Sequence, residues 1–208
     1  MNEVGADELL YYAARKAQDD RAVRVGWRDQ LAQERRFQQL AKVIAHRRDD
    51  AFTIADLGCG FGDLALFLQG AGYSAMKYMG YDRLAEMVSE AAASHPLRKF
   101  VHVADASEID AADYCVASGI FNLKFCFGDA DWLDHILPTF NILNERSRHG
   151  FAFNMLTRYS DAEHMRPELY YADPGRIFDH CKTHFSRNVA LLHDYDEYEF
   201  TIIVRKDG

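Results

Sequence analysis

Three glycines at alternate positions, Gly58, Gly60 and Gly62, separate the apolar segment 52–57 from a helical pattern over 63–69. Glycine adopts left-handed backbone conformations without steric cost, so such a turn can be tight and can let a ligand touch the main chain. The order strand, glycine turn, helix is typical of α/β folds that bind nucleotide-like cofactors. The turn therefore predicts an α/β fold with a cofactor site at the end of its first strand.

The rest of the chain alternates between strand-like and helical patterns. Strands are expected at 52–57, 76–81, 100–104, 114–118, 151–156, 189–193 and 200–205. Helices are expected at 63–69, 84–94, 131–146 and 174–184, and Pro138 should kink or split the third of them. Strands that alternate with helices form parallel sheets through right-handed crossovers. The pattern therefore predicts a three-layer sandwich around a mostly parallel seven-stranded sheet, with the last two strands as an antiparallel hairpin.

The length of 208 residues suits one α/β domain, and no repeat or linker divides it. Residues 1–48 have the pattern of a helical N-terminal extension, and residues 49–208 that of the core. No apolar run is long enough to cross a bilayer and the N-terminus lacks the pattern of a signal peptide, so no membrane association and a cytoplasmic location are expected. His180 and His184 share a helix face without a third ligand nearby, and the cysteines are scattered, so no metal site is expected.

The spacing of the glycines narrows the cofactor class. Dinucleotide-binding turns have the pattern GxGxxG, whereas the third glycine here comes one residue early. The run from Asp56 to Gly62 resembles the first motif of the class I S-adenosylmethionine-dependent methyltransferases, an acidic residue followed by xGxGxG. Asp82, twenty residues after Gly62, has the residue type and position that bind ribose hydroxyls. The resemblance covers about residues 50–205 and implies a Rossmann-like fold with S-adenosylmethionine as cofactor.

The same resemblance assigns further residues to the cofactor. Asp105 and Ala106 follow the third strand, where the family places an acid near the adenine, and Ser118 follows the fourth, near the methionine part. The extension is expected to cover the methionine end as a lid, with Trp27 and with Arg36 pairing the carboxylate, and to be dispensable for folding of the sheet. The expected cofactor residues are Asp56, Gly58, Cys59, Gly60, Gly62, Asp82, Arg83, Asp105, Ala106, Ser118, Trp27 and Arg36.

The reacting atoms should lie beyond the carboxyl ends of the strands. His193, Asp194 and Tyr195 follow the sixth strand, and His193 is expected as the general base because imidazole titrates near neutral pH. The alternative is that His193 only packs against the hairpin. The expected substrate contacts are Asn122, Asn154, Tyr170 and Tyr171.

Charge and missing motifs limit the substrate class. The net charge of −8 makes nucleic acid an unlikely partner. Residues 14–48, however, hold ten Lys and Arg against four Asp and Glu, so an anionic substrate stays one of the alternatives. The segment SGIFN after the fourth strand differs from the Asn/Asp-Pro-Pro-aromatic stretch of amino-group DNA methyltransferases, and no proline precedes a cysteine as in cytosine-C5 enzymes. The expected function is methyl transfer to an oxygen or nitrogen of a small molecule. Three alternatives stay open: a non-catalytic S-adenosylmethionine-binding protein, a nicotinamide-dependent oxidoreductase, and a tRNA or protein methyltransferase.

Overall fold

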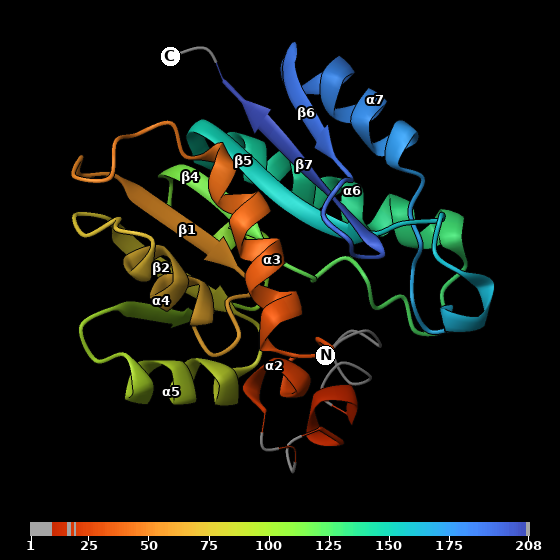
Figure 1. Ribbon diagram of the computed structural model, residues 1–208, viewed down its shortest axis with the longest axis horizontal. Helices are drawn as coiled ribbons and strands as arrows, with labels where there is room; N and C mark the ends of the chain where they lie inside the picture. The colour runs from red at the N-terminus through yellow and green to blue at the C-terminus, as the bar shows by residue number, and fades with distance from the viewer. Residues whose placement is uncertain (1–9, 16–17, 19, 207–208) are drawn as a thin grey trace.

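The computed structural model describes residues 10–15, 18 and 20–206. Seven strands form one sheet in the order β3-β2-β1-β4-β5-β7-β6 (Figure 1). The strands are β1 (Thr53–Leu57), β2 (Lys77–Asp82), β3 (Lys99–His102), β4 (Ala112–Ala117), β5 (Ser147–Leu156), β6 (Asn188–Leu192) and β7 (Glu199–Arg205). The helices are α2 (Arg21–Arg24), α3 (Gln30–Leu40), α4 (Asp63–Gly70), α5 (Ala85–Ser94), α6 (Asp129–Arg146) and α7 (Pro174–His184), with the 3-10 turns η1 (Ala41–Val43), η2 (Ala106–Glu108) and η3 (Ala162–His164).

The register of the central strands brings their carboxyl ends level. β1 pairs in parallel with β2 and with β4, and Leu57 at its end lies beside Tyr81 on one side and Ala117 on the other. β7 runs antiparallel between β5 and β6. The mostly parallel sheet with an antiparallel C-terminal hairpin is thereby confirmed. The strand order reverses between β1 and β4, and in such sheets ligands bind in the crevice at that point.

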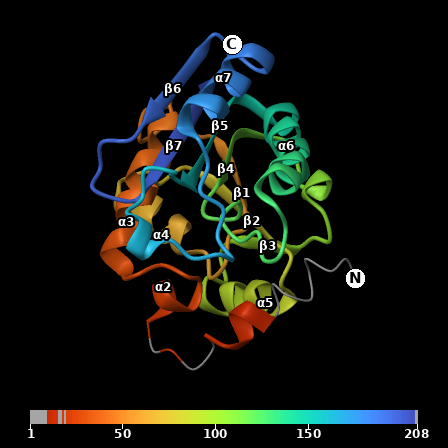
Figure 2. The ribbon, with the colours of Figure 1, turned by 90° about the vertical axis from the view of Figure 1, so that its right-hand side faces the viewer.

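Successive side chains of the central strands point to opposite faces of the sheet, and each face has its own helices. Ile54 packs with residues of α3 and α4, whereas its neighbour Ala55 packs with residues of α6 and α7. α5 packs on β2 and β3. Figure 2 views the strands nearly end-on, with α3 and α6 on opposite sides of β1 to β4 and with α2 and α5 below. The arrangement is the expected three-layer sandwich.

α3 belongs to the core, which differs from the expectation that residues 1–48 form a separable extension. Asp29 accepts a hydrogen bond from the backbone N–H of Ala32 at 2.7 Å and so caps the start of the helix. Phe37, Leu40 and Val43 then pack against the sheet, with exposed fractions of 5%, 0% and 0%. Only the part of the described chain before α3 lies outside this layer.

Two other connections test the expected pattern. α6 continues from Asp129 to Arg146 through Pro138, so the proline does not split the helix. Between β3 and β4 the chain forms only the 3-10 turn η2. None of the helices in the described residues combines the length and the apolar character needed to span a membrane.

Candidate active site

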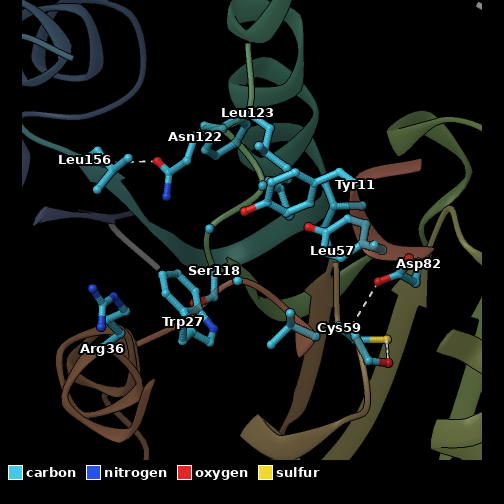
Figure 3. A pocket seen from close by; sticks show the side chains of 18 of the residues that line it. Tyr11, Trp27, Arg36, Leu57, Cys59, Asp82, Ser118, Asn122, Leu123 and Leu156 are labelled. Atoms are coloured by element: carbon cyan, nitrogen blue, oxygen red, sulfur yellow. Dashed lines mark hydrogen bonds between the residues drawn. The ribbon is translucent and has the colours of Figure 1, made fainter. Parts of the chain in front are cut away.

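A cavity of about 860 Å³ opens at the carboxyl ends of β1, β2 and β4. The glycine turn, the strand ends, the N-terminal segment and the loops after β4 and β5 all contribute to its wall (Figure 3). The expected cofactor residues that line it are Trp27, Arg36, Asp56, Gly58, Cys59, Gly60, Asp82, Arg83, Asp105, Ala106 and Ser118. Gly62 does not line the cavity: it precedes α4 with φ of 80°, and a Cβ there would meet the Phe100 ring at 2.7 Å.

The glycine turn is fastened to the end of β2. The backbone N–H groups of Gly58 and Cys59 donate to the carbonyl oxygen of Tyr81 at 2.7 and 3.0 Å. Gly58 and Gly60 have φ of 76° and 53°, the left-handed conformation that favours glycine. The Cys59 thiol is buried, and burial raises its pKa, so it packs as an apolar group and not as a nucleophile. The turn therefore presents main chain to the cavity.

Asp82 holds the turn and faces the cavity at the same time. One carboxylate oxygen accepts from the Gly60 N–H at 2.9 Å, and the other accepts from the Leu84 N–H at 2.9 Å (Figure 3). Burial raises the pKa of this carboxyl, and the backbone N–H groups that it accepts from oppose the rise. Each carboxylate oxygen keeps a second lone pair, so Asp82 can also accept hydrogen bonds from a ligand.

Asp56 and Ser118 place buried polar atoms without hydrogen-bond partners on the cavity wall. The hydroxyl of Tyr78 donates to one oxygen of Asp56 at 2.5 Å, while the other oxygen, Oδ1, is buried and unpaired. Burial raises the pKa of Asp56 to about 7. The hydroxyl oxygen of Ser118, at the end of β4, is also buried without a partner. Unpaired buried polar atoms are uncommon and point to a ligand that completes their hydrogen bonds.

Asp105 lies where the third strand has ended. Its side chain accepts from the Ser107 N–H at 2.8 Å, and Glu108 reaches back to the Asp105 N–H at 3.0 Å, which closes a capping box over η2. The hydrogen bond from Ser107 lowers the pKa of Asp105. The structure therefore places carboxylates at the ends of three neighbouring strands, β1, β2 and β3, on one side of the cavity.

The N-terminal segment covers the glycine turn. The guanidinium of Arg21 donates to the carbonyl oxygen of Phe61 at 2.9 Å, and Arg24 pairs with Glu90 of α5 at 2.9 Å. Both arginines also lie over the Phe61 ring, at 4.9 and 4.4 Å from its centroid. Figure 1 shows α2 between α3 and α5. These contacts fix the segment as one wall of the cavity.

Trp27 packs on the turn after β4. A Cβ at Gly119 would lie 2.6 Å from the Trp27 ring, so only glycine allows this approach. The Arg36 guanidinium lies over the same ring, 4.4 Å from its centroid. The stack Arg36, Trp27, Gly119 joins α3 to the end of β4 (Figure 3).

Arg36 has other partners than the expected carboxylate of the cofactor. Its Nε pairs with Glu199 at 2.8 Å, its Nη2 with Glu197 at 3.2 Å, and its Nη1 donates to the carbonyl oxygen of Ala32 at 2.5 Å. Although Arg36 lines the cavity, each of its three guanidinium nitrogens therefore already has a partner in the protein. Glu197 and Glu199 also line the cavity, and the sequence pattern indicated only an acidic turn at this place.

Only two of the four expected substrate residues, Asn122 and Tyr171, line the cavity. Asn154 is fully buried: its side-chain oxygen accepts from the Gly119 N–H at 2.9 Å, and its amide nitrogen donates to Glu199 at 2.5 Å. Tyr170 is buried in the core beside the loop. Asn154 is therefore a residue that positions the β4 turn, not one that faces the cavity.

His193, Asp194 and Tyr195 do not line the cavity. β6 is the edge strand, and β7 and β5 separate it from β4, but the turn after β6 reaches the cavity through Glu197, Tyr198 and Glu199. His193 is exposed beside Tyr159 and Phe200, with ring centroids at 6.0 and 6.2 Å. The end of β6 therefore meets the cavity through residues 197–199 and not through the predicted His193, Asp194 and Tyr195.

Other parts of the cavity wall are formed by residues that were not predicted from the sequence. The loop after β4 and α6 contribute Leu123, Phe125, Trp132, His135, Pro138, Thr139 and Ile142. The N-terminal segment contributes Tyr11, Tyr12 and Arg15, and the loop after β5 contributes Ser160, His164, Arg166 and Leu169. The doublet Tyr11-Tyr12 was a visible signal in the sequence, whereas Trp132 sits in an ordinary amphipathic pattern. In the described residues, no group of three or more His, Cys, Asp or Glu side chains is placed to hold a metal ion.

Comparison with known proteins gives one clear relative. No protein-family profile matches the chain. A Mycobacterium tuberculosis (strain ATCC 25618 / H37Rv) protein named "Putative methyltransferase Rv1506c" is 51% identical over 158 residues, which cover 76% of this chain and 95% of that protein. At this identity and coverage the two proteins belong to one family.

Solved methyltransferase structures share the fold at low sequence identity. The DhpI complex with SAM and HEP superposes with a TM-score of 0.67 at 16% identity, covering 99% of each chain. Magnesium protoporphyrin IX methyltransferase (ChlM) from Synechocystis PCC 6803, with bound SAM, superposes with a TM-score of 0.60 at 14% identity, covering 99% of this chain and 93% of that one. With the glycine turn, the sheet order and the curated relative in agreement, the chain belongs to the class I S-adenosylmethionine-dependent methyltransferases.

Proposed function

We propose that this protein transfers a methyl group from S-adenosylmethionine to an oxygen or nitrogen atom of a small molecule. The observation that carries the proposal is the cavity at the strand ends. Its volume of about 860 Å³ lies in the upper part of the range of roughly 300–1,000 Å³ that is typical of small-molecule sites. This volume leaves space for an acceptor beside the cofactor.

The residues on the carboxylate side fit the cofactor. S-adenosylmethionine carries ribose hydroxyls, two amino groups and a positive sulfonium, all of which favour carboxylate neighbours. Asp82 fits the ribose, Asp105 and Ala106 fit the adenine, and the unpaired oxygens of Asp56 and Ser118 supply acceptors toward the methionine part. The cofactor that the family uses therefore matches the acceptors that the fold leaves open.

When bound, S-adenosylmethionine supplies an electrophilic methyl group on sulfur, and the chain has to align the acceptor with it and exclude water. Trp27 and the Tyr11-Tyr12 pair close the cavity from the N-terminal side. The side-chain oxygen of Asn122 accepts from the Leu156 N–H at 3.0 Å, and in Figure 3 its amide nitrogen turns away from Leu156. Asn122 is thus held in a fixed orientation, and its amide nitrogen can donate a hydrogen bond to a polar group of the substrate.

Calorimetry with the purified chain tests the cofactor part of the proposal. S-adenosylmethionine and S-adenosylhomocysteine are expected to bind with a Kd in the micromolar range, about −8 kcal/mol, and NAD is not. Asp82→Asn should weaken the binding of S-adenosylmethionine and of S-adenosylhomocysteine by about 1.5–3 kcal/mol each, because a hydrogen bond to a charged group is lost. Asp179→Asn, at an exposed position of α7 away from the cavity, is the matched control and should change nothing. NAD binding as tight as that of the methyl donor would instead favour the oxidoreductase alternative.

Turnover tests the acceptor part. Phenols, carboxylates and amines are screened by release of S-adenosylhomocysteine, together with tRNA and protein as macromolecular acceptors. Release with a small molecule supports the proposal, and release with tRNA or protein alone contradicts it. Tight donor binding without turnover on any acceptor would favour a non-catalytic binding protein.

A further inference from the structure

Most arginines on the cavity wall are already engaged. Arg28 and Arg36 pair with Glu197 at 3.7 and 3.2 Å, and Arg83 also has an interaction partner in the protein. Within the described part of the chain, the two cavity-lining arginines without an acidic partner are Arg15 and Arg166. Two cationic side chains are therefore available to a ligand.

Arg15 and Arg166 line the cavity from different parts of the chain, and Arg15 stacks on Tyr11. The Arg15 guanidinium lies 3.4 Å from the centroid of the Tyr11 ring, and one of its nitrogens donates to the Tyr11 carbonyl oxygen at 3.0 Å. Arg166 is held by its backbone N–H, which donates to the Tyr171 hydroxyl at 3.0 Å. Burial raises the pKa of Tyr11, and the charges of Arg15 and then Arg166 oppose that rise, while Glu168 adds to it. Both guanidinium groups thus lie within electrostatic range of one hydroxyl.

The cavity-lining acids have other places or other partners: Asp63 pairs with Arg21, and Glu197 and Glu199 pair with Arg36. The carboxylates of Asp56, Asp82 and Asp105 stand at the ends of β1, β2 and β3, on the side that fits the cofactor. Glu168 is not among the residues that line the cavity. Figure 3 shows Tyr11 reaching into the cavity, with its hydroxyl toward the middle. The cavity is therefore acidic toward the cofactor and basic around Tyr11.

We propose that the acceptor carries an anionic group, a carboxylate or a phosphate ester, which Arg15 and Arg166 bind beside Tyr11. Guanidinium forks match the oxygens of both groups through charge-assisted hydrogen bonds. Because Arg15 belongs to the N-terminal segment and Arg166 to the loop after β5, the anion joins two walls of the cavity. This inference rests on the proposed function and names the substrate class for the same site.

The test uses the full chain saturated with S-adenosylhomocysteine and three small probes. Benzoate, phenyl phosphate and the neutral benzamide, which has nearly the shape of benzoate, are titrated while the fluorescence of Trp27 and Trp132 is followed, since both rings line the cavity. Benzoate or phenyl phosphate is expected to bind at least tenfold more tightly than benzamide. Which of the two anions binds more tightly distinguishes a carboxylate acceptor from a phosphate ester.

Variants connect the preference to the two arginines. Arg15→Gln and Arg166→Gln should each weaken the binding of the two anions about tenfold and leave the affinity for benzamide unchanged. Arg166→Lys should retain part of the affinity for the anions because it keeps the charge. Arg47→Gln removes an exposed arginine outside the cavity and should change nothing. The affinity for S-adenosylhomocysteine should stay within twofold of the wild-type value in every variant, which would show that the site is folded.

Each outcome has a distinct meaning. If S-adenosylhomocysteine does not bind to the wild-type chain, the proposed function itself fails. If it binds but benzoate and phenyl phosphate bind no better than benzamide, or do not bind at all, only the anionic acceptor is excluded. A preference for anions that survives in both glutamine variants would move the anion site elsewhere and overturn the assignment of Arg15 and Arg166.

Discussion

At the scale of single residues, the buried carboxyl of Asp56 makes the stability of the folded chain depend on pH. This carboxyl is 2% exposed, and burial raises its pKa from the usual value near 3.8 to about 7. Such a group binds its proton more tightly in the folded chain than in the unfolded one. Between about pH 4 and 7 the folded state therefore holds more protons, and the contribution of Asp56 to the free energy of unfolding falls as pH rises through this window.

Asp56→Asn should remove this dependence. The amide keeps an oxygen for the hydrogen bond from the Tyr78 hydroxyl and has no charge to bury. The free energy of unfolding of the variant, relative to that of wild type, is expected to increase from pH 5 to 7 by up to about 1 kcal/mol per pH unit and to level off above pH 7. Urea unfolding at pH 5, 6, 7 and 8, without cofactor, measures this difference.

Asp113→Asn is the control for that measurement. Burial raises the pKa of Asp113, but hydrogen bonds from Thr53 and Arg148 outweigh it, so the net shift is downward. Its stabilising contribution is complete above the unfolded pKa and is lost only as pH falls below about 4. The difference between this variant and wild type should therefore be constant from pH 5 to 8. A constant difference for Asp56→Asn as well would show that Asp56 is already charged in the folded chain.

Arg36 shows what residue type alone can and cannot predict. The sequence predicted that Arg36 lies at the cavity and pairs with the carboxylate of the cofactor; Arg36 does line the cavity, but its guanidinium pairs with Glu197 and Glu199. Its partners, Glu197 and Glu199, lie about 160 residues away in the chain and were read as part of a turn. The spacing of residues contains no information about such a pairing, because it depends on β7 lying beside β5 in the sheet.

At the scale of elements, the N-terminal segment divides into two parts with different roles. α3 is a core element, whereas the segment before it contacts the glycine turn and the cavity through Tyr11, Tyr12, Arg21 and Trp27. The second part is therefore the better candidate for a lid over the cofactor.

Two truncations separate these roles. Removing residues 1–28 should leave a chain that unfolds cooperatively and binds S-adenosylmethionine at least tenfold more weakly, because one wall of the cavity is lost. Removing residues 1–48 should abolish folding, because Phe37, Leu40 and Val43 each contribute about 1.5–3 kcal/mol to a total of about 5–15 kcal/mol. Circular dichroism during heating and calorimetry measure both effects. Full donor affinity after the shorter truncation would exclude a lid, and a folded product of the longer one would show that α3 is dispensable.

The elements themselves could be predicted from the sequence wherever a pattern was local. The seven strands, the glycine turn and the N-cap of α7 by Asp173 follow from alternation, glycine spacing and capping chemistry, which act over a few residues. The failures concern long-range placement. Pro138 does not split α6, which packs against β4 and β5, and His193 follows the edge strand and does not line the cavity. In both cases tertiary packing decided what the local sequence left open.

At the scale of the whole molecule, the uneven charge along the sequence is partly cancelled by ion pairs in the fold. Residues 14–48 carry an excess of arginine and lysine, and five of their arginines pair with acids. Arg21 pairs with Asp63 and Arg24 with Glu90, while Arg35 and Arg36 share Glu197. These five arginines are thus neutralised where they meet the rest of the chain, whereas Arg15 has no acidic partner among the described residues.

This cancellation predicts that the protein does not bind nucleic acid. Sequence-independent binding depends on Lys and Arg that neutralise phosphates, and a net charge of −8 repels the phosphate backbone. Fluorescence anisotropy with a labelled tRNA at 0.15 M NaCl should give a Kd weaker than about 10⁻⁴ M, the weak end of ordinary non-specific binding. Saturable binding at micromolar tRNA that weakens steeply with salt would contradict this, since it would require a basic surface that the paired arginines do not form. If Glu197→Gln created such binding, the pairing of Arg35 and Arg36 would be shown to be what suppresses it.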